Sequence, residues 1–242
     1  MKKGILAALA VVLILSGCAT RSISDSGYKE GGYYGHRNDN PFYKGELSEF
    51  DVLGIEAGKE ISEKDITTAA ATKKERITLR KGDTLMIIQS GAMLPDEDMT
   101  KNMEKYFSVT VFTGVPETNK KENTSYAKAL RFAAAKAGIE KIFVYWGVLE
   151  SGTRNLATKT ISWVPIVGGA IPDQTQEIRI RLKVALIDVK TGQWEMFSPK
   201  IFEDTATSAS LNRAHSDQEQ VALLKTKAYE AAVESTISRY VR

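Results

Sequence analysis

The stretch KIFVYWGVL at residues 141–149 is almost entirely apolar, and no other feature constrains the fold as much. Such a strand is expected at the centre of a sheet that is covered on both faces, because both rows of its side chains must then be buried. Residues 176–202 differ, since apolar and basic residues alternate from Ile178 to Val184 before the turn sequence Lys190-Thr191-Gly192. This alternation predicts a long hairpin with one buried and one solvated face.

Segments with helical periodicity surround these strands. Residues 124–138 place apolar side chains at helical spacing and end at Gly138, and residues 216–241 open with a capping pair, Ser216 and Glu219. The order of the elements predicts an α/β (α+β) fold, a single mixed β-sheet with packed helices. Further helices are expected at 62–74 and 95–107, and further strands at 49–55, at 76–91 (two strands around the turn 81–83) and at 108–115.

The N-terminus has the pattern of a secretory signal. Lys2 and Lys3 precede an apolar run at residues 5–15, and the small residues Ser16 and Gly17 follow it. The run is shorter than the ~20 apolar residues that a membrane-spanning helix needs. We therefore expect a cleaved signal peptide at 1–17, and the alternative is an ordinary secretory signal that happens to end near a cysteine.

The sequence Leu15-Ser16-Gly17-Cys18 resembles the lipobox of bacterial lipoproteins. The resemblance implies that the Cys18 thiol receives a diacylglycerol and that its new amino terminus receives an acyl chain such as palmitate. Several acyl chains anchor a protein stably where a single chain is marginal. Ala19, rather than an aspartate, follows the cysteine, which by analogy with lipoprotein sorting implies the periplasmic face of the outer membrane. Cys18 is the only cysteine, so no disulfide is expected.

Composition separates the mature chain into two parts. Residues 18–45 are rich in Gly, Ser, Asn and charge without an apolar period, which predicts a lipidated, disordered tether before a periplasmic domain at 46–242. The hydrophobic content of 43% is ample for a core. The net charge is +3, and Lys2 and Lys3 supply two of these charges, so no nucleic-acid partner is expected. The two histidines stand in separate polar segments and predict neither a metal site nor a cofactor.

The stretches FSVTVF, AKALRFAAAKAGIEKIFVYWGVLES and RIRLKVALIDVKTGQWEMF are followed by a terminal helix. This order resembles the periplasmic lipoprotein group that includes CsgG, LpoB and the TolB amino-terminal domain. The resemblance implies an envelope interaction domain without catalytic residues. Residues 151–175 lack the paired alternating strands of the curli-type pore, so a pore is not expected. The likeness spans residues 84–241 and includes the hairpin pattern L-x-D-x-x-T-G at Leu186, Asp188, Thr191 and Gly192.

A serine acyl-transferase is the competing hypothesis. Ser125 and Lys128 form an S-x-x-K pattern at the start of a helix, and K-T-G at 190–192 and S-x-N at 210–212 echo the other motifs of the penicillin-binding class. However, the S-x-N pattern follows K-T-G instead of preceding it, and Thr-Gly is ordinary turn sequence. Short patterns of common residues recur by chance, so an envelope hydrolase, either a peptidase or an acyl-transferase, is the alternative only.

The segment SWVPIVGGAIPD at 162–173 is unusually apolar for a connection between strands. It either folds back over the domain or exposes a patch for a partner, through Trp163, Val164, Ile166, Val167 and Ile171. We expect an outer-membrane lipoprotein, held to the membrane through Cys18, that is a non-catalytic periplasmic interaction or assembly factor. Its role would lie in envelope biogenesis, secretion or cell-wall enzyme regulation, and its partner would be another envelope protein or a second copy of itself.

Overall fold

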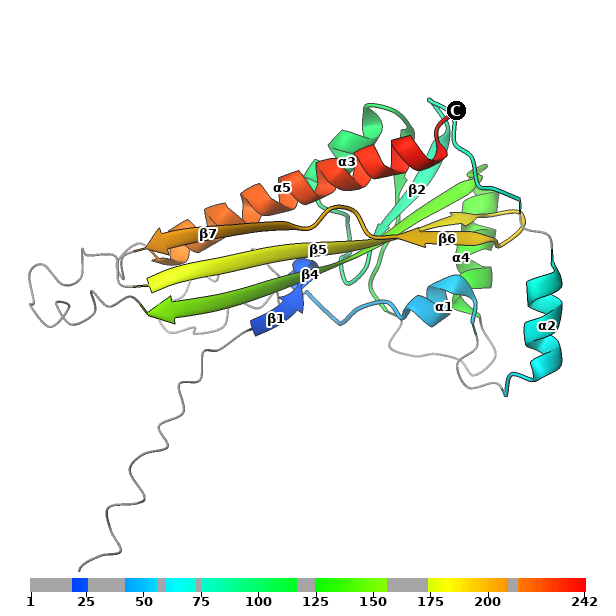
Figure 1. Cartoon of the computed structure of the whole chain (residues 1–242). Helices are drawn as coiled ribbons and strands as arrows, with labels where there is room; N and C mark the ends of the chain where they lie inside the picture. The colour runs from blue at the N-terminus through cyan, green and yellow to red at the C-terminus, as the bar shows by residue number, and fades with distance from the viewer. Residues whose placement is uncertain are drawn as a thin grey trace, which may run out of the picture.

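The structure is a computed structural model that describes residues 19–25, 42–55, 60–72, 75–116, 125–155, 174–208 and 213–242. These residues form one mixed sheet with helices on both faces, which confirms the predicted fold class (Figure 1). The strands are β1 (Ala19–Ser22), β2 (Thr84–Gln89), β3 (Ser108–Val111), β4 (Lys141–Asn155), β5 (Gln174–Asp188), β6 (Trp194–Phe197) and β7 (Phe202–Ser208). The helices are the 3-10 helix η1 (Ile23–Asp25) and α1 (Glu49–Leu53), α2 (Glu63–Ala71), α3 (Glu97–Glu104), α4 (Tyr126–Lys136) and α5 (Arg213–Tyr240).

Strands β4 and β5 form a hairpin that is much longer than the strands beside it. They pair antiparallel over 15 residues each, which is roughly 50 Å at the usual rise per residue. In the near half of the hairpin, where Lys141 pairs with Asp188, the strand order is β3-β2-β4-β5-β6. In the far half, which ends where Asn155 pairs with Gln174, β1 flanks β4 and β7 flanks β5.

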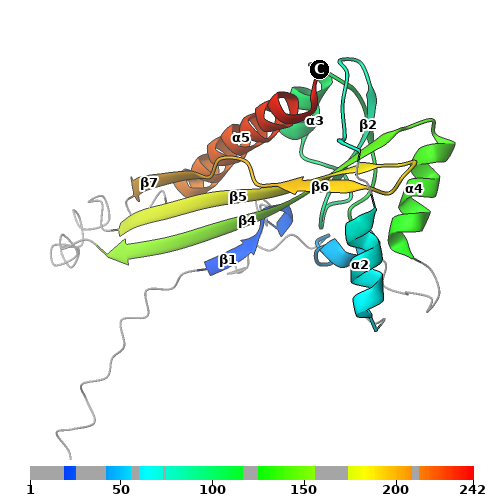
Figure 2. The same cartoon turned by 45° about the vertical axis from the view of Figure 1, so that its right-hand side comes forward.

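The near half of the sheet is buried on both faces, as the apolar run at 141–149 predicts. Phe143 and Tyr145 pack into a core with α3 and α5, whereas Ile142, Val144 and Trp146 pack into a second core with α1 and α4. Figure 2 shows α5 and α3 above the sheet and α4 and α1 on its opposite side. Alternate residues of β4 therefore face different helices, and both rows must be apolar.

Two predicted strands are wrong. Residues 49–53 form helix α1, because the Ser48 side chain accepts a hydrogen bond from the Asp51 backbone N–H and Gly54 ends the helix in the left-handed conformation, at φ 76°. Of the two strands expected in 76–91, only β2 forms. The preceding arm makes one parallel bridge, from Leu79 to Val241 beyond α5. The predicted helices at 62–74, 95–107, 124–138 and 216–241 are confirmed as α2, α3, α4 and α5, and the strand at 108–115 as the shorter β3.

Residues 19–25, which lie in the predicted tether, form β1 and η1 instead of an unstructured spacer. Strand β1 pairs antiparallel with β4, with Ala19 opposite Ser151. Ile23 of η1 is 1% exposed and lies over Gly147 of β4. A Cβ atom at Gly147 would lie 2.4 Å from Ile23 Cδ1, so this glycine leaves the space that Ile23 fills. One apolar residue in a polar segment was too weak a signal to predict this contact.

Replacing Ile23 by alanine tests how firmly the N-terminal segment is docked. We expect Ile23→Ala to lower the free energy of unfolding by about 2–4 kcal/mol, because truncation of a buried isoleucine removes apolar contacts and leaves a cavity. The control is Ile66→Ala on α2, where the side chain is 52% exposed. Its effect should stay within about 0.5 kcal/mol. Urea unfolding of the two variants measures both values, and equal losses would contradict the docking of Ile23.

Candidate functional site

The residues predicted to carry lipid and partner contacts lie outside the described residues. These are Cys18 and the segment 162–173 with Trp163, Val164, Ile166, Val167 and Ile171. The described strands nevertheless show where both connect to the sheet. Cys18 immediately precedes β1, and residues 156–173 leave the sheet at Asn155 and return at Gln174. Both connections are therefore made at the far half of the long hairpin.

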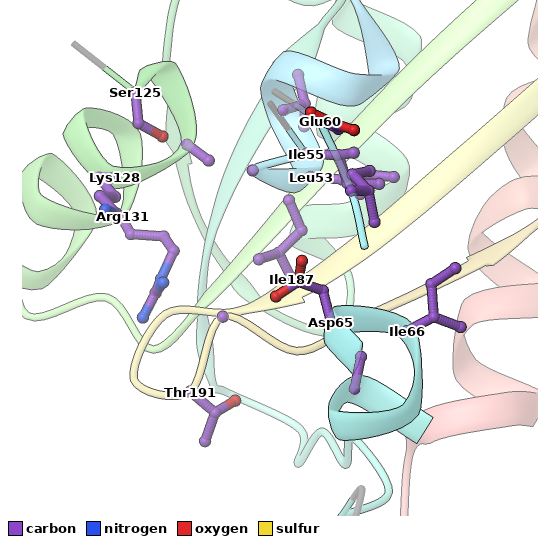
Figure 3. A pocket seen from close by; sticks show the side chains of 16 residues that line it. Leu53, Ile55, Glu60, Asp65, Ile66, Ser125, Lys128, Arg131, Ile187 and Thr191 are labelled. Carbon is purple, nitrogen blue, oxygen red and sulfur yellow. The ribbon is translucent and has the colours of Figure 1, made fainter. Parts of the chain in front are cut away.

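A cavity of about 670 Å³ lies in the near half, between α1, α2, α4 and the turn that joins β5 to β6. Its volume falls within the range typical of small-molecule sites. The lining includes Ser125 and Lys128 of the S-x-x-K pattern together with Thr191 and Gly192 of the K-T-G pattern (Figure 3). The fold thus brings residues of the S-x-x-K and K-T-G patterns to one cavity.

Helix α4 provides a basic side of this cavity. Arg131 donates hydrogen bonds from Nε to the Val189 carbonyl (2.8 Å) and from Nη2 to the Lys190 carbonyl (3.0 Å). Both acceptors are neutral, and within the described ranges neither Lys128 nor Arg131 forms an ion pair with a carboxylate. The guanidinium is therefore held in place while its charge stays uncompensated by an acidic side chain.

The β5–β6 turn explains the K-T-G pattern. Asp188 accepts hydrogen bonds from the Thr191 backbone N–H (2.7 Å) and hydroxyl (2.8 Å), and Gly192 has the positive φ of 74° that the turn requires. Burial of Asp188 raises the pKa of its carboxyl, but the Thr191 bonds and the ion pair with Lys141 outweigh burial and hold that pKa below its usual value. The Thr191 hydroxyl is therefore engaged in turn structure.

The S-x-x-K residues do not form a nucleophile–base pair in this arrangement. Activation of a serine requires a hydrogen bond from its hydroxyl to a base. Among the described residues, neither the Ser125 side chain nor that of Lys128 makes a hydrogen bond. Ser125 is the N-cap residue of α4, although its side chain does not cap the helix. The third motif, at 210–212, lies outside the described residues.

The opposite side of the cavity is helix α2, which has no buried residue. Its start is stabilised by a capping box, in which Ser62 and Asp65 exchange hydrogen bonds. Ile61 and Ile66 line the cavity but remain 56% and 52% exposed. A helix of this length is marginal by itself, and stability normally comes from packing of its apolar face. The described part of the protein therefore leaves the apolar residues of α2 incompletely covered.

A second polar feature lies buried beneath the N-terminal segment and is centred on Gln89 at the end of β2. The Gln89 carboxamide donates to Ser24 Oγ (3.0 Å) and accepts from the Tyr145 hydroxyl (2.5 Å) and the Asp96 backbone N–H (2.7 Å). Ser24 in turn donates to the Ser90 carbonyl (2.6 Å). Because η1 begins five residues after Cys18, these bonds connect the predicted lipid attachment point to the core.

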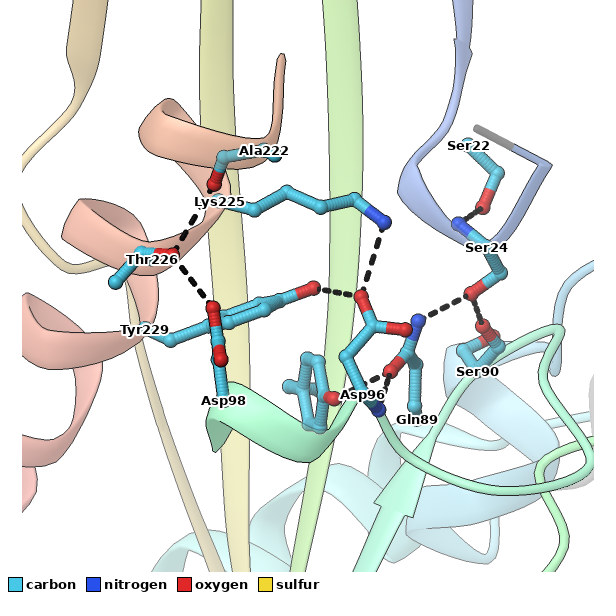
Figure 4. Close-up of polar contacts among 11 residues, drawn as sticks. Ser22, Ser24, Gln89, Ser90, Asp96, Asp98, Ala222, Lys225, Thr226 and Tyr229 are labelled. Atoms are coloured by element: carbon cyan, nitrogen blue, oxygen red, sulfur yellow. Dashed lines mark hydrogen bonds and ion pairs between the residues drawn. The ribbon is translucent and has the colours of Figure 1, made fainter. Parts of the chain in front are cut away.

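The same network continues to the C-terminal helix through Asp96. Its carboxylate accepts from the Tyr229 hydroxyl (2.5 Å) and pairs with Lys225 Nζ (2.9 Å), both on α5 (Figure 4). Lys225 is largely buried, with a side chain 14% exposed. Buried polar groups whose hydrogen bonds are satisfied favour one arrangement of their elements. The network therefore holds η1, β2, β4 and α5 in fixed positions.

The basic residues Arg179, Arg181 and Lys183 alternate along β5 on the sheet face opposite α5, as predicted for a solvated face. Glu150 on β4 accepts from Arg179 Nε (2.6 Å) and Arg181 Nη2 (3.2 Å), and Lys183 pairs with Glu49 at 2.5 Å. These pairs are partly exposed, so they contribute little stability and leave little uncompensated charge.

Because Tyr145 and Tyr229 are buried in this network, we expect the free energy of unfolding to decrease at alkaline pH. Burial, together with the nearby Asp96 carboxylate, raises the pKa of Tyr145 well above 10. The pKa of Tyr229 is also raised well above 10, by burial and by the neighbouring Tyr145 and Asp96. In the unfolded chain each phenol ionises near pH 10. The free energy of unfolding should therefore be unaffected by these groups below pH 10 and fall as the pH rises above it.

The variant Tyr229→Phe isolates this effect, because it removes one of the two titrating phenols. We expect its free energy of unfolding to fall less steeply above pH 10 than that of the wild type, by about 1.4 kcal/mol per pH unit. Urea unfolding at a series of pH values measures the slope. An identical slope in the variant and the wild type would show that Tyr229 is not kept protonated by the fold.

The described residues offer neither a metal cluster nor a membrane-spanning helix. They contain no group of three or more His, Cys, Asp or Glu side chains placed to hold a metal ion. None of their helices combines the length and apolarity needed to cross a bilayer.

Comparison with solved structures finds distant likenesses. The PelC dodecamer from Paraburkholderia phytofirmans is 13% identical, with 65% of this chain and 93% of that chain covered and a TM-score of 0.29. The hypothetical protein CT253 from Chlamydia trachomatis is 11% identical, with 66% and 97% covered and a TM-score of 0.31. Lipoprotein GNA1162 from Neisseria meningitidis is 14% identical, with 59% and 98% covered and a TM-score of 0.23. Likenesses this distant carry no functional information.

Comparison with curated protein sequences gave no match. The family described as YafT bacterial lipoprotein, in contrast, matches residues 48–239, which include most of the described sheet and all five α-helices except the last residue of α5. The match begins at the N-cap of α1 and ends one residue before α5 does. The chain therefore belongs to the YafT family of bacterial lipoproteins.

Proposed function

We propose that this protein is an outer-membrane lipoprotein that faces the periplasm and acts as a non-catalytic interaction or assembly factor. In this proposal residues 1–17 are removed and Cys18 carries the lipid. Membership of a bacterial lipoprotein family supports membrane attachment.

The observation that carries the proposal is the direct connection between Cys18 and a docked strand. Ala19 is the first residue of β1 and pairs with Ser151, and Ile23 is buried over Gly147. A lipid on Cys18 would therefore be joined to the folded body without a long spacer. Such a connection restricts how the domain is oriented at the membrane, which favours the positioning of a binding surface.

With a lipid on Cys18, the two halves of the sheet would lie in different surroundings. Along β4, Ser151 lies ten residues beyond Lys141, which corresponds to roughly 33 Å. The far half, where β1 enters, is then next to the membrane. The near half, with the cavity and the β5–β6 turn, extends away from the anchor.

The apolar segment 162–173 is the proposed contact with a partner. Residues 156–173 begin and end at the tip of the far half, four residues beyond the Ser151–Ala19 pair. Trp163, Val164 and Ile166 are thus joined to the same half of the sheet as Cys18, and an envelope protein bound there would itself be close to the membrane. Figure 1 shows the end of β4 and the start of β5 side by side, in the half of the sheet where β1 lies.

In-cell photocrosslinking tests this proposal. A photoreactive residue in place of Trp163 should capture one dominant envelope protein or a second copy of the chain. The matched control is Trp194, a 39% exposed tryptophan of β6 in the near half, which should not capture that partner. The variant Cys18→Ser should leave the outer-membrane fraction and lose the Trp163 crosslink, because the domain is then no longer held at the membrane.

Three outcomes would count against the proposal. Crosslinks of Trp163 only within the chain would remove the segment as a partner site. Retention of Cys18→Ser in the outer membrane would exclude lipidation of Cys18 as the anchor. Covalent labelling of Ser125 by a β-lactam probe would support the acyl-transferase alternative, for which the joint position of Ser125, Lys128 and Thr191 in one cavity is the favouring observation.

A further inference from the structure

We propose that the cavity between α1, α2 and α4 binds a short apolar peptide with a free carboxyl terminus. This inference concerns the near half of the sheet and does not rest on the membrane attachment or on the segment 162–173. It follows from the distribution of charge and apolar surface around the cavity, which has a basic side, an acidic side and an apolar region between them.

The basic side matches a carboxylate. Arg131 is fixed by its two bonds to backbone carbonyls, and its Nη1 is held close to Gly192, where a Cβ atom would lie 2.5 Å away. The two hydrogen bonds of the guanidinium use Nε and Nη2, and Nη1 donates to no acceptor among the described residues. A planar guanidinium with a free N–H and a lysine one helical turn away form a suitable site for a carboxylate.

The acidic side distinguishes a peptide from a simple anionic amphiphile. Glu60 and Asp65 line the cavity from the segment that begins α2, whereas Lys128 and Arg131 line it from α4 (Figure 3). A fatty acid would gain from the basic side but would place no positive charge near the two acidic residues. A peptide carries an amino group and amide N–H groups as well as a carboxylate, so it complements both sides.

The apolar region between the two charged sides gives the preference for apolar side chains. Ile187 of β5 lies at the base of the cavity, and Ile55, Ile61 and Ile66 line it from the α1–α2 region. Ile61 and Ile66 keep more than half of their surface exposed. A bound apolar side chain would cover them at a gain of about 25 cal/mol for each Å² removed from water.

Calorimetric titration of the lipidated protein in nanodiscs tests the inference. The probe is the tetrapeptide alanyl-valyl-leucyl-leucine with a free carboxyl terminus, compared with its C-terminal amide, and empty nanodiscs correct for partitioning. We expect the amide to bind at least about tenfold more weakly, because a charge-assisted hydrogen bond to the guanidinium is lost. A third titration uses decanoate, an anionic amphiphile without a peptide group.

Substitutions on α4 locate the binding site. Lys128→Gln and Arg131→Gln should each weaken binding of the free-acid peptide severalfold and should reduce its preference over the amide. The matched control is Lys136→Gln, which removes an exposed lysine of the same helix that is not among the cavity residues. Arg131 also holds the β5–β6 turn, so Arg131→Gln can misfold. In that case Lys128→Gln and the comparison of the acid with the amide test the inference.

Each contrary result overturns the inference in a different way. Equal affinity for the acid and the amide would show that no carboxylate is recognised. No binding of the tetrapeptide would exclude the peptide class. Tighter binding of decanoate than of the peptide would assign the cavity to lipid. These outcomes are independent of membrane localisation, so they leave the proposed function unaffected.

Discussion

Every other strand of the sheet is joined, directly or through β2, to the antiparallel pair β4–β5. In its near half the pair is buried on both faces, between the α3–α5 core and the α1–α4 core. In its far half the same strands present one face to α5 and the other, with the Glu150 ion pairs, to solvent. One hairpin therefore supplies a rigid centre and an extension to which β1 and β7 add.

The length of the β4–β5 hairpin separates the docked N-terminal segment, in the far half, from the cavity, in the near half. The N-terminal segment is docked on the far half by the Ile23–Gly147 contact and is connected to α5 through Gln89 and Asp96. The cavity with its opposed charges lies in the near half. A restraint applied at the N-terminus would thus reach the core through the buried hydrogen bonds of Gln89 and Asp96. The cavity would then keep a defined position relative to the proposed lipid on Cys18.

Helices and strands with a clear hydrophobic periodicity could be predicted from the sequence. Elements whose conformation depends on one or two residues could not. The apolar run in β4 and the long amphipathic pattern of α5 were sufficient for their elements. In α1 the alternation of Phe50 and Val52 indicates a strand, but the caps at Ser48 and Gly54 decide for a short helix. Strand β7 was missed because the polar sequence FEDTATS shows no period, and it forms because β5 offers an edge.

The candidate sites were harder to predict, because they depend on contacts between distant residues. The S-x-x-K and K-T-G patterns are near each other only because the β5–β6 turn packs beside α4, where Arg131 reaches two carbonyls of the turn. Gln89 follows four apolar residues of β2, and its partners Ser24, Asp96 and Tyr145 come from three other parts of the chain. Nothing in the local sequence indicates that these residues meet.

If Cys18 carries a lipid, the direct connection between Cys18 and β1 can be measured as the distance of the domain from the membrane. Spin labels at Glu177→Cys in the far half and Lys190→Cys in the near half would be read against labelled headgroups in nanodiscs, since lipid would block the Cys18 thiol. We expect narrow distance distributions, with residue 190 farther from the bilayer by up to roughly 35 Å. Broad and overlapping distributions at both positions would contradict it.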